Sequence, residues 1–98
     1  YMYLDDNMGI AAPVAYAGLE DDVTDKSEAV EILAASMDHV RAAVAAMSDA
    51  ELEAPTTLYG NDVAKWAVLL QLVAHMNEHL GQSIAYARSN GVVPPWSR

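Results

Sequence analysis

Apolar residues recur at helical spacing in two long segments of the chain. In the first segment, apolar positions alternate at intervals of three and four residues: Val30, Leu33, Met37, Val40, Val44 and Met47. This pattern is typical of a helix that buries one face, and it predicts a long helix over about residues 25–47. Thr24 or Asp25 can cap its start, and Glu28 stands at the capping-box position for Asp25.

The second segment has the same periodicity over a greater length. Its central apolar stripe consists of Trp66, Leu69, Val73, Met76, Leu80, Ile84 and Ala87. We predict a helix over about residues 62–89, ended by Asn90 and Gly91, because Gly readily adopts the left-handed conformation of a C-cap. Pro94-Pro95-Trp96 then forms a stiff tail.

Shorter elements are predicted around these helices. Tyr1 to Asp6 reads as the last turn of a helix that ends at Asn7 and Gly9, and residues 10–23 read as a connecting loop. Ser48-x-x-Glu51 is a capping box, but Pro55 limits the helix after it to a turn or two. Residues 56–61 read as a loop that can run extended.

Two long helices cannot cover each other's apolar arcs, so further packing surface is needed. Either further helices before Tyr1 or another copy of this chain supplies it. We therefore predict an all-α helical bundle, with residues 1–98 as a single, partial helical domain. A homo-oligomer, most simply a dimer, follows from this burial argument.

Charge and composition exclude several classes of function. Of 14 acidic and 5 basic residues, 12 acidic and 2 basic residues lie at or before Glu53, which leaves −10 on that part of the chain. Such a surface repels phosphate, and we expect no nucleic-acid binding. No apolar run is long enough to span a membrane. The absence of cysteine excludes disulfides and thiolate metal sites, and we expect a cytoplasmic protein.

His75 and His79 are the candidate metal-binding residues. Side chains four residues apart on a helix lie about 5–6 Å apart at Cβ, so two imidazoles at this spacing can share one divalent ion. The alternative is a pair of structural or surface histidines. We place His39, the third histidine, on the exposed side of its helix and outside any metal site.

The string from His75 to His79 also matches H-x-x-E-H, an inverted zinc-peptidase motif in which Glu78 would activate water. That chemistry needs a further acidic ligand from a later helix. Only 19 residues follow His79 and none is acidic, so we expect Glu78 to face solvent.

The C-terminal third resembles the DinB family, also described as DinB/YfiT-like metalloenzymes. The residues that carry this resemblance are His75 and His79, Gly81-Gln82, Tyr86-x-Arg88 and the tail from Asn90 to Ser97. The resemblance implies a four-helix bundle, usually dimeric, with a divalent metal such as Zn²⁺ or Ni²⁺ held by three histidines. His75 and His79 match the two on the last helix. Related groups are thiol S-transferases, so the resemblance implies a small-molecule or thiol substrate.

The third histidine of that set has no counterpart between Tyr1 and Leu19, and in this alignment it falls before Tyr1. We therefore expect this chain to be the C-terminal part of such a fold, with the metal site completed by water, a carboxylate or a neighbouring chain. Two functions stay open: a metal-dependent enzyme, transferase-like or hydrolase-like, and a non-enzymatic helical homo-oligomer. No general base is assigned.

Overall fold

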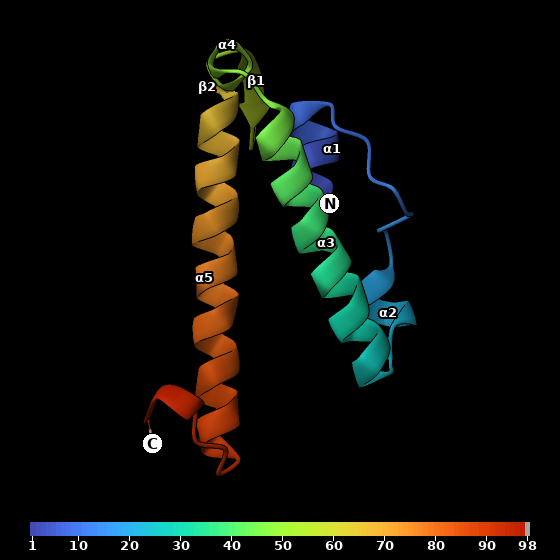
Figure 1. Ribbon diagram of the computed structural model, residues 1–98, viewed down its shortest axis with the longest axis vertical. Helices are drawn as coiled ribbons and strands as arrows, with labels where there is room; N and C mark the ends of the chain where they lie inside the picture. The colour runs from blue at the N-terminus through green and yellow to red at the C-terminus, as the bar shows by residue number, and fades with distance from the viewer. Residues whose placement is uncertain (98) are drawn as a thin grey trace. The chain divides into compact units, whose positions relative to one another are not determined.

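The computed structural model describes residues 1–97, of which most are helical (Figure 1). The elements in chain order are α1 (Met2–Met8), α2 (Leu19–Asp22), α3 (Lys26–Ala46), α4 (Asp49–Leu52), β1 (Pro55–Leu58), β2 (Asn61–Ala64), α5 (Lys65–Ser89) and the 3-10 turn η1 (Pro95–Ser97). The chain divides into two compact units, Tyr1–Val68 and a second that begins at Leu69.

The buried side chains of the first unit belong to α1 and to the start of α5, and α1 packs against the β-hairpin. The fully buried side chains there are Leu4 and Val68, with Tyr3 and Met8 nearly so. α1 is also joined to β1 by hydrogen bonds: Asn7 Nδ2 donates to the Thr57 carbonyl at 2.8 Å, and the Thr56 hydroxyl donates to the Asn7 carbonyl. Because apolar burial and backbone-directed hydrogen bonds coincide here, this contact organises the first unit.

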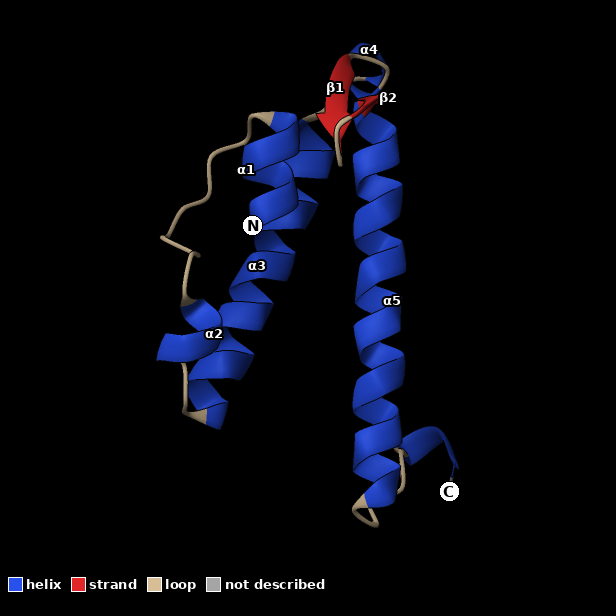
Figure 2. Ribbon diagram, turned by 180° about the vertical axis from the view of Figure 1, so that it is seen from behind, coloured by secondary structure: helices blue, strands red, loops and turns tan. Residues whose placement is uncertain are grey.

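The hairpin turns through Tyr59 and Gly60, both of which have positive φ, 51° and 78°. Two consecutive residues of positive φ define the tight turn whose twist matches that of antiparallel strands. The register pairs Leu58 with Asn61 and Pro55 with Ala64. These are the only strands in the described part of the chain (Figure 2).

Side-chain caps begin α3 and α4 as predicted. The Asp25 carboxylate accepts hydrogen bonds from the backbone N–H groups of Ser27 and Glu28. Ser48 and Glu51 form a complete capping box at the start of α4. Each cap satisfies backbone donors that have no partner inside the first helical turn.

α5 extends over 25 residues and begins three residues later than predicted. Asn61–Ala64 pairs with β1 as a strand, so these residues cannot also form the first turn of the helix. The helix ends as predicted at Asn90-Gly91, where Gly91 has φ 78°. In the tail, Pro94 is buried and Arg88 Nη2 donates to the Ser97 hydroxyl at 3.3 Å.

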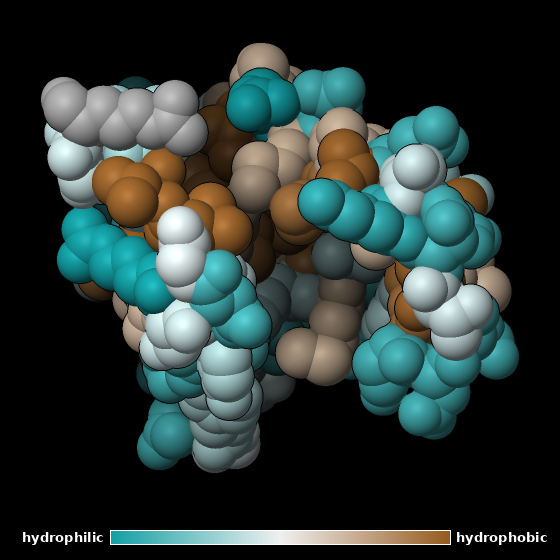
Figure 3. All heavy atoms as spheres, turned by 90° about the horizontal axis from the view of Figure 1, so that it is seen from below, coloured by the Kyte–Doolittle hydropathy of each residue, from teal (hydrophilic) through white to brown (hydrophobic). Residues whose placement is uncertain are grey.

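The predicted apolar stripes of the long helices are mostly at the surface. α3 contains no buried residue and α5 contains one, Val68. Apolar side chains are visible on the surface in Figure 3, and those that are large and exposed include Val30, Leu33, Val44, Trp66, Leu70, Val73, Leu80 and Tyr86. The fold is therefore mostly helical, as predicted, and the two-stranded sheet is an addition. A four-helix bundle is not confirmed. No helix in the described residues is long and apolar enough to cross a membrane.

Candidate functional site

His75 and His79 meet on one face of α5. Their Nε2 atoms lie 3.0 Å apart, and their ring centroids are 4.5 Å apart with the rings nearly perpendicular. His79 is exposed and His75 is half-buried. The four-residue spacing thus brings the two Nε2 atoms into contact.

The separation of these nitrogens suits two ligands of one metal ion. Nitrogens that each lie about 2.0–2.1 Å from zinc are about 2.9–3.4 Å apart for ligand angles between about 90° and 110°. The observed 3.0 Å falls within this interval.

Gln82 contacts the other ring nitrogen of His79. The Nδ1–H of His79 donates to Gln82 Oε1 at 3.1 Å. Nε2 of His79 shares a hydrogen bond with Nε2 of His75. Ligating histidines commonly donate their second N–H to an outer partner, which orients the ring and makes the ligating nitrogen more basic.

The contact with Gln82 was not predicted, because the apolar pattern places Gln82 toward water. Gln82 is indeed exposed, yet it lies three residues after His79 and so occupies the neighbouring turn of the same face. The contact between His79 and Gln82 could have been predicted from this three-residue spacing, had it been considered for polar residues as well as for histidines.

Glu78 is the only carboxylate after Asp62, and it is exposed as expected. Within the described residues, no group of three or more histidine, aspartate or glutamate side chains is arranged to hold an ion. Among the described residues, His75 and His79 come together as a pair.

The prediction that His39 is exposed is wrong. Its ring is half-buried and lies 5.5 Å from the ring of Tyr1, between centroids. Its Nε2 atom is buried without a hydrogen-bond partner among the described residues. The prediction assumed that α3 buries a single apolar stripe, whereas Tyr1, far away in sequence, covers another side of the helix.

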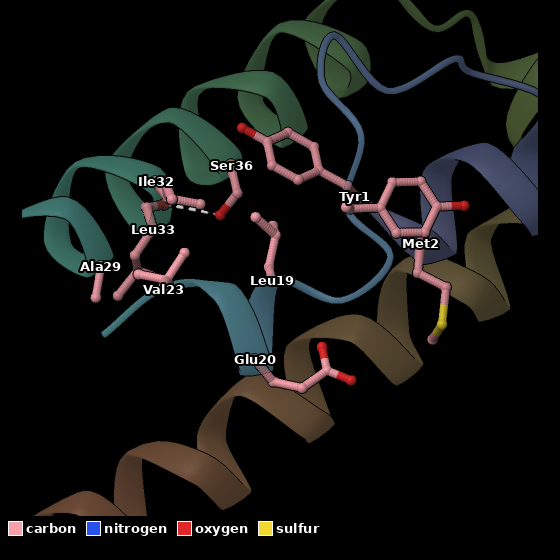
Figure 4. Close-up of a pocket in the computed structure, with 10 residues that line it drawn as sticks. Tyr1, Met2, Leu19, Glu20, Val23, Ala29, Ile32, Leu33 and Ser36 are labelled. Carbon is pink, nitrogen blue, oxygen red and sulfur yellow. Dashed lines mark hydrogen bonds between the residues drawn. The ribbon is translucent and has the colours of Figure 1, made fainter. Parts of the chain in front are cut away.

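A pocket of about 550 Å³ lies in the first unit, between residues of α1, α2 and α3 (Figure 4). Its walls are mostly apolar, and Leu19 and Val23 approach Leu33 there. Glu20 is the one charged side chain among the lining residues. A single carboxylate in an apolar wall is too few ligands for a metal, so this pocket offers no comparable chemistry.

The comparison with protein families finds one family model that covers most of the chain. The model of the DinB superfamily matches residues 3–87, which include α5 as far as Ala87. The chain belongs to the DinB superfamily. No curated protein and no solved structure is significantly similar to the chain.

Proposed function

We propose that this chain binds a divalent metal ion, Zn²⁺, Ni²⁺ or a similar ion, through Nε2 of His75 and Nε2 of His79. The observation that supports this proposal is the convergence of the two Nε2 atoms to 3.0 Å on an accessible face of α5. Membership of the DinB superfamily is consistent with it.

The proposed reaction class is that of a metal-dependent enzyme, transferase-like or hydrolase-like, acting on a small molecule such as a thiol. A bound ion supplies Lewis-acid chemistry, which polarises a substrate atom. In the chain itself, Gln82 orients the ring of His79, and the proton that the two Nε2 atoms share must leave their contact before both can ligate.

The test is the metal content of the purified chain and of a His75→Ala/His79→Ala double variant. We expect stoichiometric metal in the parent and none above background in the double variant. Binding should weaken as the pH falls, because a protonated imidazole has no lone pair to donate. Glu78→Gln is the matched control, since Glu78 lies on the same helix and is exposed. Equal metal content in parent and double variant would refute the proposal.

A second candidate function is supported by a different observation, the exposure of large apolar side chains on α3 and α5. It is a non-enzymatic homo-oligomer that uses these faces for packing. Exposed apolar surface of this kind is typical of interaction sites. Size-exclusion chromatography tests it: a species larger than 10.5 kDa is expected, and a cooperatively folded monomer at all concentrations would contradict it.

A further inference from the structure

We propose that the pocket between α1, α2 and α3 binds a small organic cation, an ammonium ion that carries an apolar group. All of the lining residues lie in the first unit, and none belongs to α5. The proposal is therefore independent of metal binding by His75 and His79.

The size and the walls of the pocket suit a small molecule with an apolar body. Its volume is about 550 Å³, and pockets for small molecules commonly measure about 300–1,000 Å³. In Figure 4, Leu19, Val23 and Leu33 lie close together. Ala29 and Ile32 extend this apolar wall along α3. An apolar group that enters the pocket leaves water and covers these side chains, which favours binding.

Glu20 gives the edge of the pocket a negative charge. Its side chain is exposed and extends away from Leu33 (Figure 4). Residues 1–53 carry 12 acidic and 2 basic side chains, and the two basic ones, Lys26 and Arg41, do not line the pocket. A ligand whose apolar group lies inside can therefore place an attached ammonium group beside the Glu20 carboxylate, in a field that attracts cations.

The tyrosines of the pocket favour the same kind of ligand. Tyr1 and Tyr16 both line it. The Tyr16 hydroxyl donates to Asp6 Oδ1 at 2.9 Å, and this hydrogen bond raises the pKa of Tyr16. Donation to a carboxylate increases the electron density of the phenol ring, and the electron-rich face of an aromatic ring attracts organic cations.

The remaining polar side chain of the wall does not favour an anion. The Ser36 hydroxyl already donates to the Leu33 carbonyl at 2.7 Å, as the Tyr16 hydroxyl does to Asp6. Glu20, the one charged side chain of the lining, repels an anion. The pocket should therefore select a cation over a neutral molecule or an anion of the same length.

The experiment titrates the full chain with hexyltrimethylammonium and follows the backbone amides by NMR. Hexanol and hexanesulfonate have an apolar chain of the same length and serve as the neutral and the anionic control. We expect saturable binding of one cation per chain, with shifts centred on the lining residues. Hexanol should bind about threefold or more weakly, because it lacks the attraction to the carboxylate and the rings. Hexanesulfonate should bind most weakly.

Glu20→Gln tests the charge at the edge of the pocket. Because Glu20 is exposed, its loss should weaken binding of the cation by about two- to fivefold. Binding of hexanol should not change. Asp21→Asn is the matched control, since it removes the same charge from the next residue of α2, which does not line the pocket. Its effect should be smaller.

Leu33→Lys tests the apolar wall and brings a cation into it, so it should abolish binding of hexyltrimethylammonium. Leu70→Lys on α5 is the matched control and should bind as the parent does. Leu33 is 57% exposed and Leu70 is 61% exposed, so the fold tolerates both substitutions. Circular dichroism checks that each variant keeps its helices.

Three outcomes would overturn the proposal. The first is hexanol or hexanesulfonate binding as tightly as the cation. The second is an equal loss of affinity in Asp21→Asn and Glu20→Gln, which would show attraction by the overall charge alone. The third is unchanged binding in a helical Leu33→Lys variant. A His75→Ala/His79→Ala double variant should bind the cation as the parent does, which separates this site from the metal site proposed above.

Discussion

At the scale of single residues, the side chains proposed to bind or orient a metal ligand lie in one short stretch of α5. His75, His79 and Gln82 lie at spacings of four and three, so helical geometry alone brings their side chains onto one face. The contact between the two Nε2 atoms and the contact between His79 and Gln82 are local. The histidine pair was for that reason predictable from sequence, and Gln82 was accessible to the same reasoning.

Substitution of Gln82 by Ala should lower metal affinity without removing a ligand. The Nδ1–H of His79 would lose its acceptor, and loss of such an outer partner costs about 10–100-fold in affinity. Zinc affinity by competition with a chromophoric chelator measures this effect. Ser89→Ala, ten residues after His79 on the same helix, is the control and should bind zinc as the parent does. Equal affinity for the parent and Gln82→Ala would show that Gln82 does not act on the site.

Substitution of glycine by alanine should have opposite effects on stability at positions 60 and 81. Gly60 has φ 78° in the hairpin turn, so Gly60→Ala should cost about 1 kcal/mol of unfolding free energy, because a Cβ disfavours the left-handed region. Gly81 lies inside α5 with open space around its Cβ position. Gly81→Ala should therefore stabilise the helix by about 0.5–1 kcal/mol. Urea denaturation measures both, and a stabilising Gly60→Ala would contradict the turn geometry.

At the scale of elements, the helices follow the periodicity and the caps that the sequence shows. α3 and the end of α5 lie within a residue of the predicted bounds, because Asp25 and Gly91 act on the backbone beside them. The start of α5 differs, since pairing of residues 61–64 with β1 depends on a hydrogen-bond partner elsewhere in the chain. Residues 56–61 were predicted as a loop able to run extended, and most of this stretch is strand and turn.

The capping box of α4 should make stability depend on pH in a defined direction. Hydrogen bonds from the Ser48 backbone and then from its hydroxyl lower the pKa of Glu51 below its ordinary value of 4.5. A carboxyl whose pKa is lower in the folded state contributes stability above its unfolded pKa, and this contribution is lost as the pH falls through the folded pKa.

We therefore expect Glu51→Ala to be less stable than the parent near neutral pH and the difference to shrink in acid. Denaturant titrations at several pH values measure this difference. Glu53→Ala, an exposed acidic position next to the capping box, is the control and should show a smaller effect at neutral pH. A difference between Glu51→Ala and the parent that grows on acidification would contradict the assigned role.

At the scale of the whole molecule, burial is decided by contacts between distant segments. The buried side chains Tyr3, Leu4 and Met8 belong to α1, and this helix contacts the hairpin more than 45 residues later in the chain. Lys65 Nζ also donates to the Met8 carbonyl at 3.0 Å. The sequence pattern placed the core on the long helices instead, because periodicity shows which face is apolar and not what covers it.

Leu4→Ala tests where the stability of the first unit resides. Leu4 is completely buried, so its truncation should cost about 2–5 kcal/mol of unfolding free energy. Leu70 is apolar and 61% exposed, and Leu70→Ala should cost far less in the single chain. Thermal and urea unfolding at a protein concentration low enough to keep the chain monomeric measure both. An equal loss of unfolding free energy in the two variants would show that Leu4 does not belong to the stabilising core.

The sequence by itself determined the positions of the long helices, their caps and the histidine pair, because each depends on residues within about one turn of one another. Tertiary structure alone decided that α1 is buried against the hairpin and that residues 61–64 form a strand. It also decided that His39 lies against Tyr1. These features join segments separated by tens of residues, and the physical reason is that a local pattern carries no information about which distant partner supplies a contact.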